Sequence, residues 1–234
     1  RAELDNDGLV GPKTKAAIFD AATGEAPDPP PPVATGPALS PGSSGESVVA
    51  LQEELARTGF YRGDLDGDYG PLTAAAVVAF HKVWGLDRTT AWSGSDWDRI
   101  AGWFPAPPGY GSAGFRIEID LSRQVLFVVR DGAVAAVMPV SSGNGEYYTS
   151  RSGALVPART PQGDFSAFRN VDGWERSYLG EMYEPWYFSG GYALHGSTSV
   201  PAYPASHGCV RVSIADMDWL DARMWIGMPV HVWG

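Results

Sequence analysis

The stretch Pro204–Ser213, "PASHGCVRVS", contains Cys209, the only cysteine in the 234-residue chain. This cysteine follows His207 by two residues and precedes Arg211 by two residues. A single cysteine cannot form an internal disulfide, so the thiol is either an inert small side chain or a reactive group. The residues around it favour the second interpretation.

The chain contains four histidines, and two of them lie close to the cysteine in sequence. His81 and His231 fall in a predicted helix and in the predicted last strand, where structural roles are expected. His195 and His207 belong to the same segment as Cys209. A cysteine nucleophile needs a base that takes its proton, so this grouping predicts a Cys-His site for acyl transfer.

An extended segment at residues 209–212 places Cys209 and Arg211 on one face and the intervening valines on the other. His207 stands beside Cys209 on that segment, roughly 6–7 Å away at the backbone, which makes direct proton transfer awkward. His195 can return on an adjacent strand and face the thiol, so it is favoured as the base. A zinc site of His195, His207 and Cys209 is disfavoured because His-x-Cys is not a common zinc spacing and no second cysteine exists. No metal and no cofactor are expected.

Two proline-rich stretches, at residues 25–45 and 104–114, predict linkers, since such sequences favour extended polyproline conformation. The domain boundaries expected from them are 1–24 for the remnant of a repeat, 25–41 for a linker, 42–106 for a helical domain, 107–111 for a second linker and 112–234 for a β-rich domain.

The middle piece has helical periodicity. Val48, Leu51 and Leu55 recur at the helix period, Pro71 suits the first turn of a second helix, and Ser95 is expected to cap a third. Three short helices in about sixty residues predict a small bundle.

An Asp-rich turn follows the first helix. Asp64, Asp66 and Asp68 match the first three ligand positions of an EF-hand, but Tyr69 replaces the required Gly and Ala75 the bidentate Glu, so a calcium site is rejected. The turn recurs, because "DGLVGPKTKAAI" at 7–18 is echoed by "DGDYGPLTAAAV" at 66–77. Residues 1–24 are therefore predicted to be the second half of another copy of the bundle.

The C-terminal piece changes to the strand period. Hydrophobic residues at 115–121 alternate with Arg116, Glu118 and Asp120, which predicts a half-buried strand. Asp131-Gly132 predicts a hairpin between strands at 125–130 and 133–140. Further predicted elements are short strands at 192–195, 209–212 and 230–233, and a helix that opens with a capping box at Ser213 and Asp216.

Residues 42–104 resemble the three-helix peptidoglycan-binding domains. The resemblance rests on Leu51-Gln52, Leu55, Gly59-Phe60, Asp66-Gly67, Gly70, Thr73, Ala76-Val77, Phe80 and Gly85-Leu86. His81 departs from the family pattern, which usually has Gln there. The resemblance implies adhesion to bacterial cell-wall peptidoglycan; a generic helical spacer is the alternative.

Residues 112–234 resemble the catalytic domain of the YkuD-type L,D-transpeptidases. The motif is His195-Gly196 followed by Ser206-His207-Gly208-Cys209-Val210-Arg211, and "TPQGDF" at 160–165 matches an upstream element of the family. The resemblance implies a mostly-β fold with an active-site groove under a mobile lid formed by residues 164–191.

The resemblance also implies roles for individual residues. Cys209 would be the nucleophile and His195 the base, oriented by the carbonyl of Gly196. Ser206, His207 and Gly208 would shape the turn, and backbone N–H groups near Cys209 would form the oxyanion hole. Arg211 occupies the basic position of the motif. Candidate walls of the groove are Tyr183, Trp186, Tyr187 and Tyr192. Since Arg211 and a protonated His195 would stabilise a thiolate, the pKa of Cys209 is expected below its ordinary value.

The activity implied is peptidoglycan cross-linking. Cys209 would attack the third residue of a tetrapeptide stem, release the terminal D-Ala, and pass the acyl group from a thioester to the side-chain amine of another stem, giving a 3→3 cross-link. Water as acceptor would make the protein an L,D-carboxypeptidase. A wall-binding scaffold with an inactive catalytic domain is the alternative from another class.

Charge and hydropathy limit the partners. The net charge is −10 and the pI is near 4.8, which disfavours nucleic acid and anionic lipid as partners. No apolar run reaches the roughly eighteen residues of a membrane span. The chain starts at Arg1 rather than Met, so an upstream segment is expected. Peptidoglycan stems and strands are the expected partners of a secreted, monomeric cell-wall enzyme that carbapenems inhibit.

Overall fold

The computed structural model describes residues 36–101 and 114–234. The predicted repeat remnant at 1–24, most of the 25–41 linker and the whole 107–111 linker lie outside these ranges. The described residues fall into two compact units, one within residues 28–139 and one within residues 140–233. No helix in the described ranges is long and apolar enough to cross a membrane.

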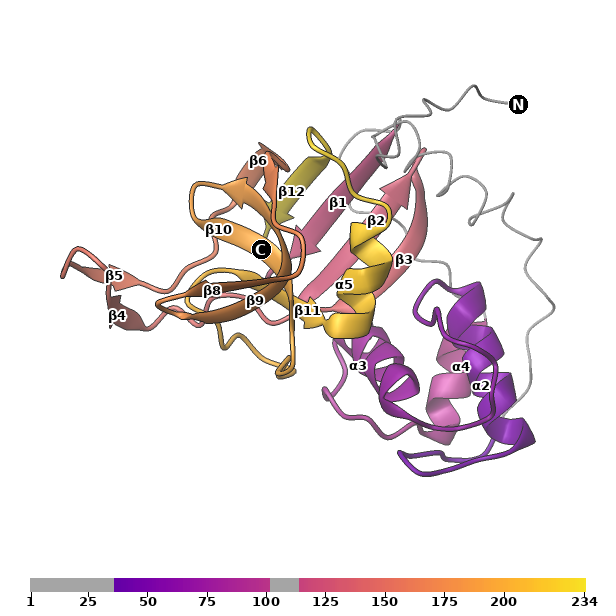
Figure 1. The fold of residues 1–234 in the computed structure, drawn as a ribbon. Coiled ribbons are helices and arrows are strands. Elements are labelled where there is room, and N and C mark those ends of the chain that lie inside the picture. The colour runs from indigo at the N-terminus through magenta and orange to yellow at the C-terminus, as the bar shows by residue number, and fades with distance from the viewer. Residues whose placement is uncertain (1–35, 102–113) are drawn as a thin grey trace, which may run out of the picture. The chain divides into compact units, whose positions relative to one another are not determined.

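The first unit contains the helices α2 (Glu46–Arg57), α3 (Pro71–Trp84) and α4 (Gly94–Ala101) (Figure 1). Pro71 opens α3, as its sequence predicts, and Gly85 ends it in the left-handed region with φ 66°. The helices share a core of fully buried side chains, which are Val48, Leu51, Leu55, Val77, Phe80, Trp92 and Ile100.

A buried amide explains the Asp-rich turn. Gln52 is fully buried in α2, and its Nε2 donates to Asp66 Oδ1 at 2.7 Å and to Thr73 Oγ1 at 3.2 Å. Its Oε1 accepts from the N–H of Gly67 at 3.0 Å. An unpartnered buried amide would cost about 1–3 kcal/mol, so the turn and Gln52 depend on each other.

The cap of α4 differs from the prediction. Ser93, not Ser95, precedes the helix, and the N–H of Ser93 donates to Asp96 Oδ2 at 2.8 Å. Ser95 lies inside the first turn, where its hydroxyl accepts from Arg99. Both serines suit an N-cap, and the position of the carboxylate three residues after Ser93 selects that one.

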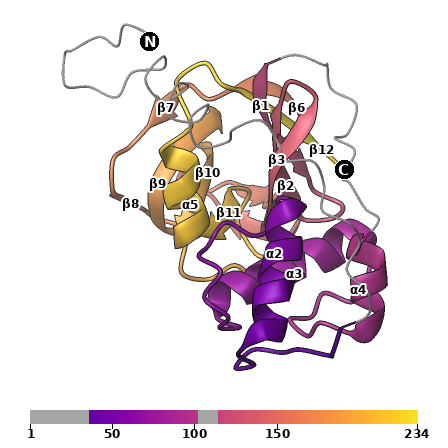
Figure 2. The same cartoon turned by 90° about the vertical axis from the view of Figure 1, so that its right-hand side faces the viewer.

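The first unit also contains an antiparallel meander of β1 (Phe115–Asp120), β2 (Val125–Arg130) and β3 (Ala133–Pro139). Asp131 and Gly132 have φ of 48° and 85°, so the predicted hairpin is confirmed. Helix α3 packs against β2 and β3 (Figure 2), and the N–H of Val137 donates to the carbonyl of Gly59 at 2.8 Å.

The prediction of a half-buried β1 is wrong. Arg116, Glu118 and Asp120 are only 5%, 0% and 4% exposed, so both faces of the strand are buried. Arg116 Nε donates to Glu118 Oε1 at 2.5 Å as a buried ion pair. Alternation identified which residues share a face, but nothing local in the sequence showed that protein covers the polar face too.

A second buried charge lies nearby in the same unit. Lys82 of α3 is 2% exposed, and its Nζ donates to the carbonyl of Gln124 at 3.1 Å. Gln124 ends the β1–β2 turn with φ of 62°. Burial, together with the charge of Arg88, lowers the pKa of Lys82 to about 7.

The second unit is mostly β. A sheet has the order β11-β10-β9-β7, with β8 also paired to β9, and α5 packs on β9, β10 and β11 (Figures 1 and 2). The β4–β5 hairpin and the β6–β12 pair complete it. The elements are β4 (Tyr147–Thr149), β5 (Leu155–Pro157), β6 (Gly163–Ser166), β7 (Arg169–Asn170), β8 (Trp174–Ser177), β9 (Gly180–Ser189), β10 (Tyr192–Ser197), β11 (Val210–Ser213), α5 (Ile214–Asp221) and β12 (Pro229–Trp233).

Local sequence signals located the last elements of the chain. The predicted strands at 192–195, 209–212 and 230–233 correspond to β10, β11 and β12, and Ser213 caps α5 by accepting from the N–H of Asp216 at 3.0 Å. The strands β4 to β9 were not predicted individually. Most of them are short, and they are held by partners distant in sequence.

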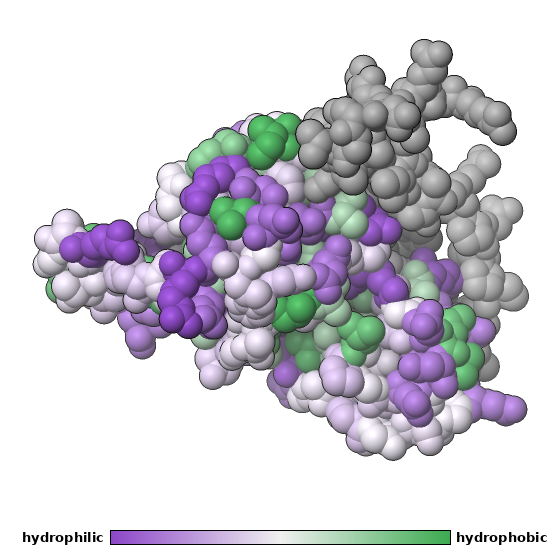
Figure 3. Space-filling view, viewed as in Figure 1, coloured by the Kyte–Doolittle hydropathy of each residue, from purple (hydrophilic) through white to green (hydrophobic). Residues whose placement is uncertain are grey.

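On the face shown in Figure 3, hydrophobic side chains form small separate patches among hydrophilic ones. Exposed large apolar residues occur in both units, for example Leu72, Leu155 and Ile226. Scattered exposed apolar side chains are usual on soluble domains, so these patches alone indicate no docking surface.

Candidate active site

The parallel pair β10 and β11 brings the predicted site residues together. In its register His195 stands opposite Arg211 and Leu194 opposite Val210. Cys209 immediately precedes β11, so Cys209, Arg211 and His195 lie on one face of the pair. The intervening Val210 is fully buried on the other face, as predicted from the alternation.

The His195 imidazole has a defined tautomer. The side chain is 4% exposed, and Nδ1 lies 2.8 Å from the carbonyl oxygen of Gly196. A carbonyl only accepts hydrogen bonds, so Nδ1 carries the proton and Nε2 has a free lone pair. Burial lowers the pKa of His195 to about 4, with a further lowering by the charge of Arg211. At neutral pH the ring is therefore an uncharged base.

Gly196 does more than supply this carbonyl. A Cβ built at Gly196 would approach Tyr183 Cδ1 to 2.9 Å and Met217 Cβ to 3.0 Å. Only glycine therefore lets β10 pass this close to β9 and α5. Residue 196 therefore orients His195 through its carbonyl and must also be glycine, because a side chain would not fit.

The Cys209 thiol lies at the edge of a small cluster of Met182, Tyr187 and Ala193. Its Sγ is 3.9 Å from the carbonyl of Gly191. Burial raises the pKa of Cys209, while the backbone N–H of Ala193 and the charge of Arg211 oppose that increase. The expectation of a lowered pKa is wrong for this state, because His195 is neutral and burial outweighs the charge of Arg211.

The turn before the thiol is held by Ser206. The buried Ser206 Oγ accepts from the N–H of Gly208 at 3.0 Å and donates to the carbonyl of Cys209 at 2.5 Å. Thr160 Oγ1 donates to the carbonyl of Gly208 at 2.8 Å and accepts from the N–H of Gly143 at 3.0 Å. Thr160, from "TPQGDF", thus fixes the loop behind the nucleophile.

Gly208 is required by two independent constraints. Its φ of 127° is outside the range that other L-residues readily adopt. A Cβ at this position would also lie 2.4 Å from Tyr192 Cε1. Tyr192 therefore packs directly on the turn that presents Cys209.

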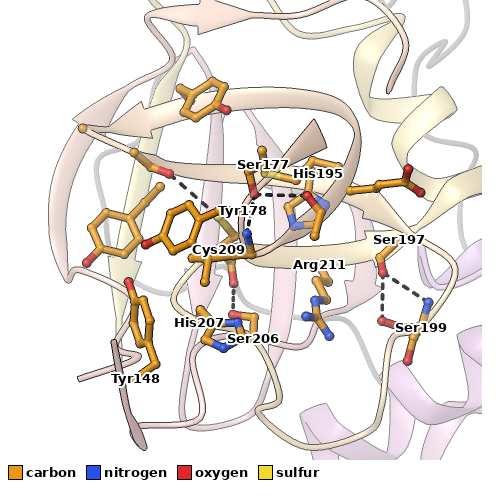
Figure 4. Close-up of a pocket in the computed structure, with 18 of the residues that line it drawn as sticks. Tyr148, Ser177, Tyr178, His195, Ser197, Ser199, Ser206, His207, Cys209 and Arg211 are labelled. Carbon is orange, nitrogen blue, oxygen red and sulfur yellow. Dashed lines mark hydrogen bonds between the residues drawn. The ribbon is translucent and has the colours of Figure 1, made fainter. Parts of the chain in front are cut away.

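His207 is exposed and turns toward β4, away from His195. Its ring packs edge-on against Tyr148, with 4.9 Å between centroids and 73° between planes. The ring thus lines the pocket beside Tyr148 (Figure 4).

One pocket of about 640 Å³ contains these groups. In Figure 4, Tyr148 and Tyr178 lie at one end, Arg211, Ser197 and Ser199 at the other, and Cys209 and His195 between them. Tyr187 and Tyr192 line the pocket, as predicted.

Tyr183 and Trp186 do not line it, so their prediction as walls is wrong. The Tyr183 hydroxyl donates to Asp218 at 2.8 Å, and Trp186 Nε1 donates to Asp221 at 2.7 Å, both in α5. The strand β9 is irregular at Glu184, where φ is 46° and the pairing with β10 shifts register. Such an irregularity changes which residues share a face.

Sequence reasoning missed a network behind Tyr187. The Tyr187 hydroxyl donates to Glu175 Oε2 at 2.7 Å, and Arg169 bonds Glu175 Oε1 at 2.8 Å. The Arg169 guanidinium also lies 4.5 Å from the Tyr187 ring centroid. Burial and the bond to Glu175 raise the pKa of Tyr187 to about 12. No sequence signal joins these three strands.

Two hairpins meet at the aromatic end of the pocket. Tyr148, on β4, and Tyr178, in the β8–β9 turn, both line this end, and burial raises the pKa of Tyr148. Arg151 of the β4–β5 turn lies 5.4 Å from the Tyr178 ring centroid. The segment 164–191 therefore borders the pocket together with the β4–β5 hairpin.

The Arg211 guanidinium makes no hydrogen bond or ion pair with any residue that the structure describes. Asp216 and Asp218, the carboxylates at the start of the next helix, contact Ser213 and Tyr183. In the described ranges, no three His, Cys, Asp or Glu side chains cluster closely enough to hold a metal ion.

Comparison with known proteins gives a consistent result. The model of the L,D-transpeptidase catalytic domain (YkuD) matches residues 114–232, and that of a peptidoglycan-binding domain matches residues 44–90. An L,D-transpeptidase structure from Xylanimonas cellulosilytica is 44% identical, covers 87% of this chain and all of that one, and superposes with a TM-score of 0.78.

The chain belongs to the YkuD L,D-transpeptidase family.

Two further relatives are more distant or shorter. An L,D-transpeptidase from Stackebrandtia nassauensis shares the fold at 24% identity, with coverage of 86% and 98% and a TM-score of 0.50. An uncharacterized protein from Kitasatospora aureofaciens is 49% identical over 51 residues, which are 21% of this chain and 43% of that protein. This chain therefore aligns with less than half of that curated relative.

Membership in the L,D-transpeptidase family identifies the protein as an enzyme and supports, in general terms, a part in peptidoglycan cross-linking. A peptidoglycan-binding domain precedes the catalytic domain. The mostly-β catalytic domain and the helices that precede it agree with that assignment.

Proposed function

We propose that Cys209 is the nucleophile of an acyl transfer on tetrapeptide stems, with His195 as its base. The observation that carries this is the bond from His195 Nδ1 to Gly196, which leaves Nε2 free beside the thiol face of β10 and β11. His207 is disfavoured as the base because it packs on Tyr148 instead.

The first half-reaction begins from an uncharged pair. His195 Nε2 takes the Sγ proton as Cys209 attacks the carbonyl carbon of the third stem residue. The resulting imidazolium gives this proton to the nitrogen of the terminal D-Ala, the C–N bond breaks, and a thioester remains. With the pKa of Cys209 raised and that of His195 near 4, proton transfer accompanies attack instead of preceding it.

The oxyanion of the tetrahedral intermediate needs N–H donors near Cys209. The N–H of Gly208 is already taken by Ser206 Oγ. We assign the role to the N–H groups of Cys209 and His207, which no described residue accepts. Ser206 and Thr160 hold the turn in place, so the donors are set before substrate arrives.

In the second half-reaction the side-chain amine of another stem attacks the thioester and gives its proton to His195. The 3→3 amide forms, Cys209 leaves as the thiolate, and His195 returns the proton to it. Tyr187 and Tyr192 are proposed walls of the stem-binding pocket. Water as acceptor would give an L,D-carboxypeptidase on the same residues.

Products distinguish these acceptors. The purified protein is incubated with a defined tetrapeptide stem, with and without a second stem, and products are identified by mass spectrometry. Release of D-Ala together with a dimer supports transpeptidation, whereas release of D-Ala and tripeptide alone supports the carboxypeptidase. A thioester trapped on Cys209, and a covalent adduct after carbapenem treatment, would identify the acylated residue.

We also propose that residues 42–106 form a three-helix module that holds the enzyme on extracytoplasmic peptidoglycan, joined by linkers to flanking parts of the chain. Wild-type protein, acylated at Cys209 by a carbapenem, should still sediment with insoluble peptidoglycan, because the groove is then blocked and the module is not. Release on acylation would assign the adhesion to the groove instead.

A further inference from the structure

We infer that Arg211 binds the carboxylate of the residue that leaves, and so restricts the enzyme to stems that end at that residue. This inference rests on the proposed acyl transfer by Cys209. It assigns to Arg211 a named part of the substrate, the free C-terminal carboxylate.

The position of Arg211 fits a leaving-group site. Arg211 follows Cys209 by two residues on the same face of an extended segment, which separates their Cα atoms by roughly 6–7 Å. Its side chain lines the pocket, and Figure 4 shows it at the end where Ser197 and Ser199 lie, away from the aromatic end. Cys209 and His195 stand between the two ends.

The guanidinium is available for a ligand. The arginines of β7 and β8 differ in this respect: Arg169 pairs with Glu175 at 2.8 Å and Arg176 with Glu181 at 2.6 Å. Arg211 has no such partner among the described residues, although its side chain is half-buried. A planar guanidinium binds a carboxylate through two parallel hydrogen bonds, a geometry that ammonium and amide groups lack.

The distances of the substrate agree with this placement. Three bonds of about 1.3–1.5 Å each separate the attacked carbonyl carbon from the carboxylate carbon of a terminal residue. That carboxylate therefore lies within about 4 Å of the carbon that Cys209 attacks, on the leaving side. A guanidinium anchored two residues beyond the nucleophile can reach such a group.

Arg211 also acts on the thiol through its charge, and this effect must be separated from carboxylate binding. Its charge lowers the pKa of both Cys209 and His195 against the other influences there. That influence is the same for a substrate with a charged end and for one with a neutral end. Discrimination between the two ends therefore reports carboxylate binding alone.

The test compares a tetrapeptide stem ending in D-Ala with the same stem ending in D-alaninamide. Release of the terminal residue is measured by mass spectrometry, and kcat/KM is obtained for wild type, Arg211→Gln and Arg176→Gln. Wild type should prefer the acid by on the order of 10- to 100-fold, the effect of losing a hydrogen-bonded charge partner. Arg211→Gln should bring the ratio near one, and Arg176→Gln should keep the wild-type ratio.

A wild-type ratio near one, or an unchanged ratio in folded Arg211→Gln, overturns the inference while the proposed acyl transfer stands. Turnover of neither stem by wild type overturns the proposed function as well. Product inhibition of wild type tests the same contact without any variant. D-alanine should inhibit and D-alaninamide should not, and equal inhibition by the two overturns the inference.

Discussion

The strands β1 and β11 have the same alternation of apolar and polar residues but opposite surroundings. In β1 the polar face, with Arg116 and Glu118, is as buried as the apolar face. In β11 the apolar face, with Val210 and Val212, is buried, and the other face presents Arg211 to a pocket beside Cys209. Alternation thus assigns residues to faces, and tertiary packing decides whether a polar face becomes an ion pair or an active site.

Replacement of the nucleophile should have the largest effect on activity. Cys209 lies on the face of β11 that opens on the pocket. Cys209→Ala should abolish D-Ala release and thioester formation, because no other thiol exists in the chain. Its melting temperature should stay close to that of wild type, since a small, partly exposed side chain is replaced by another. Residual turnover well above background would place the nucleophile elsewhere.

Replacement of the base, on the same face, should have the next largest effect on activity. His195→Ala should lower kcat by roughly 10²- to 10⁴-fold, the range for a general base. His207→Ala is the matched control and should retain most activity, because its ring packs on Tyr148. The opposite ranking of the two variants in steady-state assays would exchange their roles.

On the buried polar face of β1, removal of a polar side chain should affect stability instead of catalysis. Glu118→Ala leaves the buried Arg116 guanidinium without this partner and should lower the free energy of unfolding by about 3–5 kcal/mol. Urea unfolding measures this, and activity per folded molecule should be unchanged. Glu53→Ala, on the exposed side of α2, removes a carboxylate of the same unit as a control. Equal destabilisation by both would contradict the importance of burial.

Lys82, the second buried charge of the unit that contains β1, should make its stability depend on pH. Its pKa is about 7 in the folded protein and near 10.5 when exposed, so the unfolded chain binds more protons between these values. Stability should therefore rise with pH between about 7 and 10.5, by up to about 1.4 kcal/mol per pH unit. Lys82→Met should remove this slope, as measured by urea unfolding at several pH values. A slope identical to that of wild type would show that other groups cause it.

Arg211 should give the smallest effect through its charge on the thiol. Alkylation of Cys209 by iodoacetamide should have its midpoint above that of a free thiol, because burial raises the pKa. Arg211→Gln should move the midpoint further up, since a stabilising charge is lost. A lower melting temperature with an unchanged alkylation profile would instead indicate a structural role for this arginine.

Much of the architecture followed from local sequence signals. Asp131-Gly132 located a hairpin because its turn requires positive φ at both residues, and Ser213 with Asp216 located the start of α5. The same signals chose Ser95 instead of Ser93 for α4, because several residues there can cap a helix and only the folded turn selects one.

Only part of the site was predicted, because local signals identify residues that are close in the chain. Residues adjacent in the chain, from Ser206 to Arg211, were identified directly, whereas Thr160, Arg169, Glu175 and Tyr148 join the site from distant strands. Tyr183 was misplaced because the irregularity at Glu184 exchanges the faces of β9, and no residue pattern announces it. Trp186 is next to Tyr187 in the strand, so ordinary alternation places it on the opposite face.

By itself the sequence determined which chemical groups this protein can use: one thiol, its neighbouring histidines, and glycines where a side chain would collide. Only the tertiary structure decided the protonation state of these groups. The carbonyl of Gly196 selects the tautomer of His195, and burial keeps both His195 and Cys209 uncharged. Desolvation depends on every neighbour that excludes water from a group, and those neighbours are brought together by folding, not by proximity in the chain.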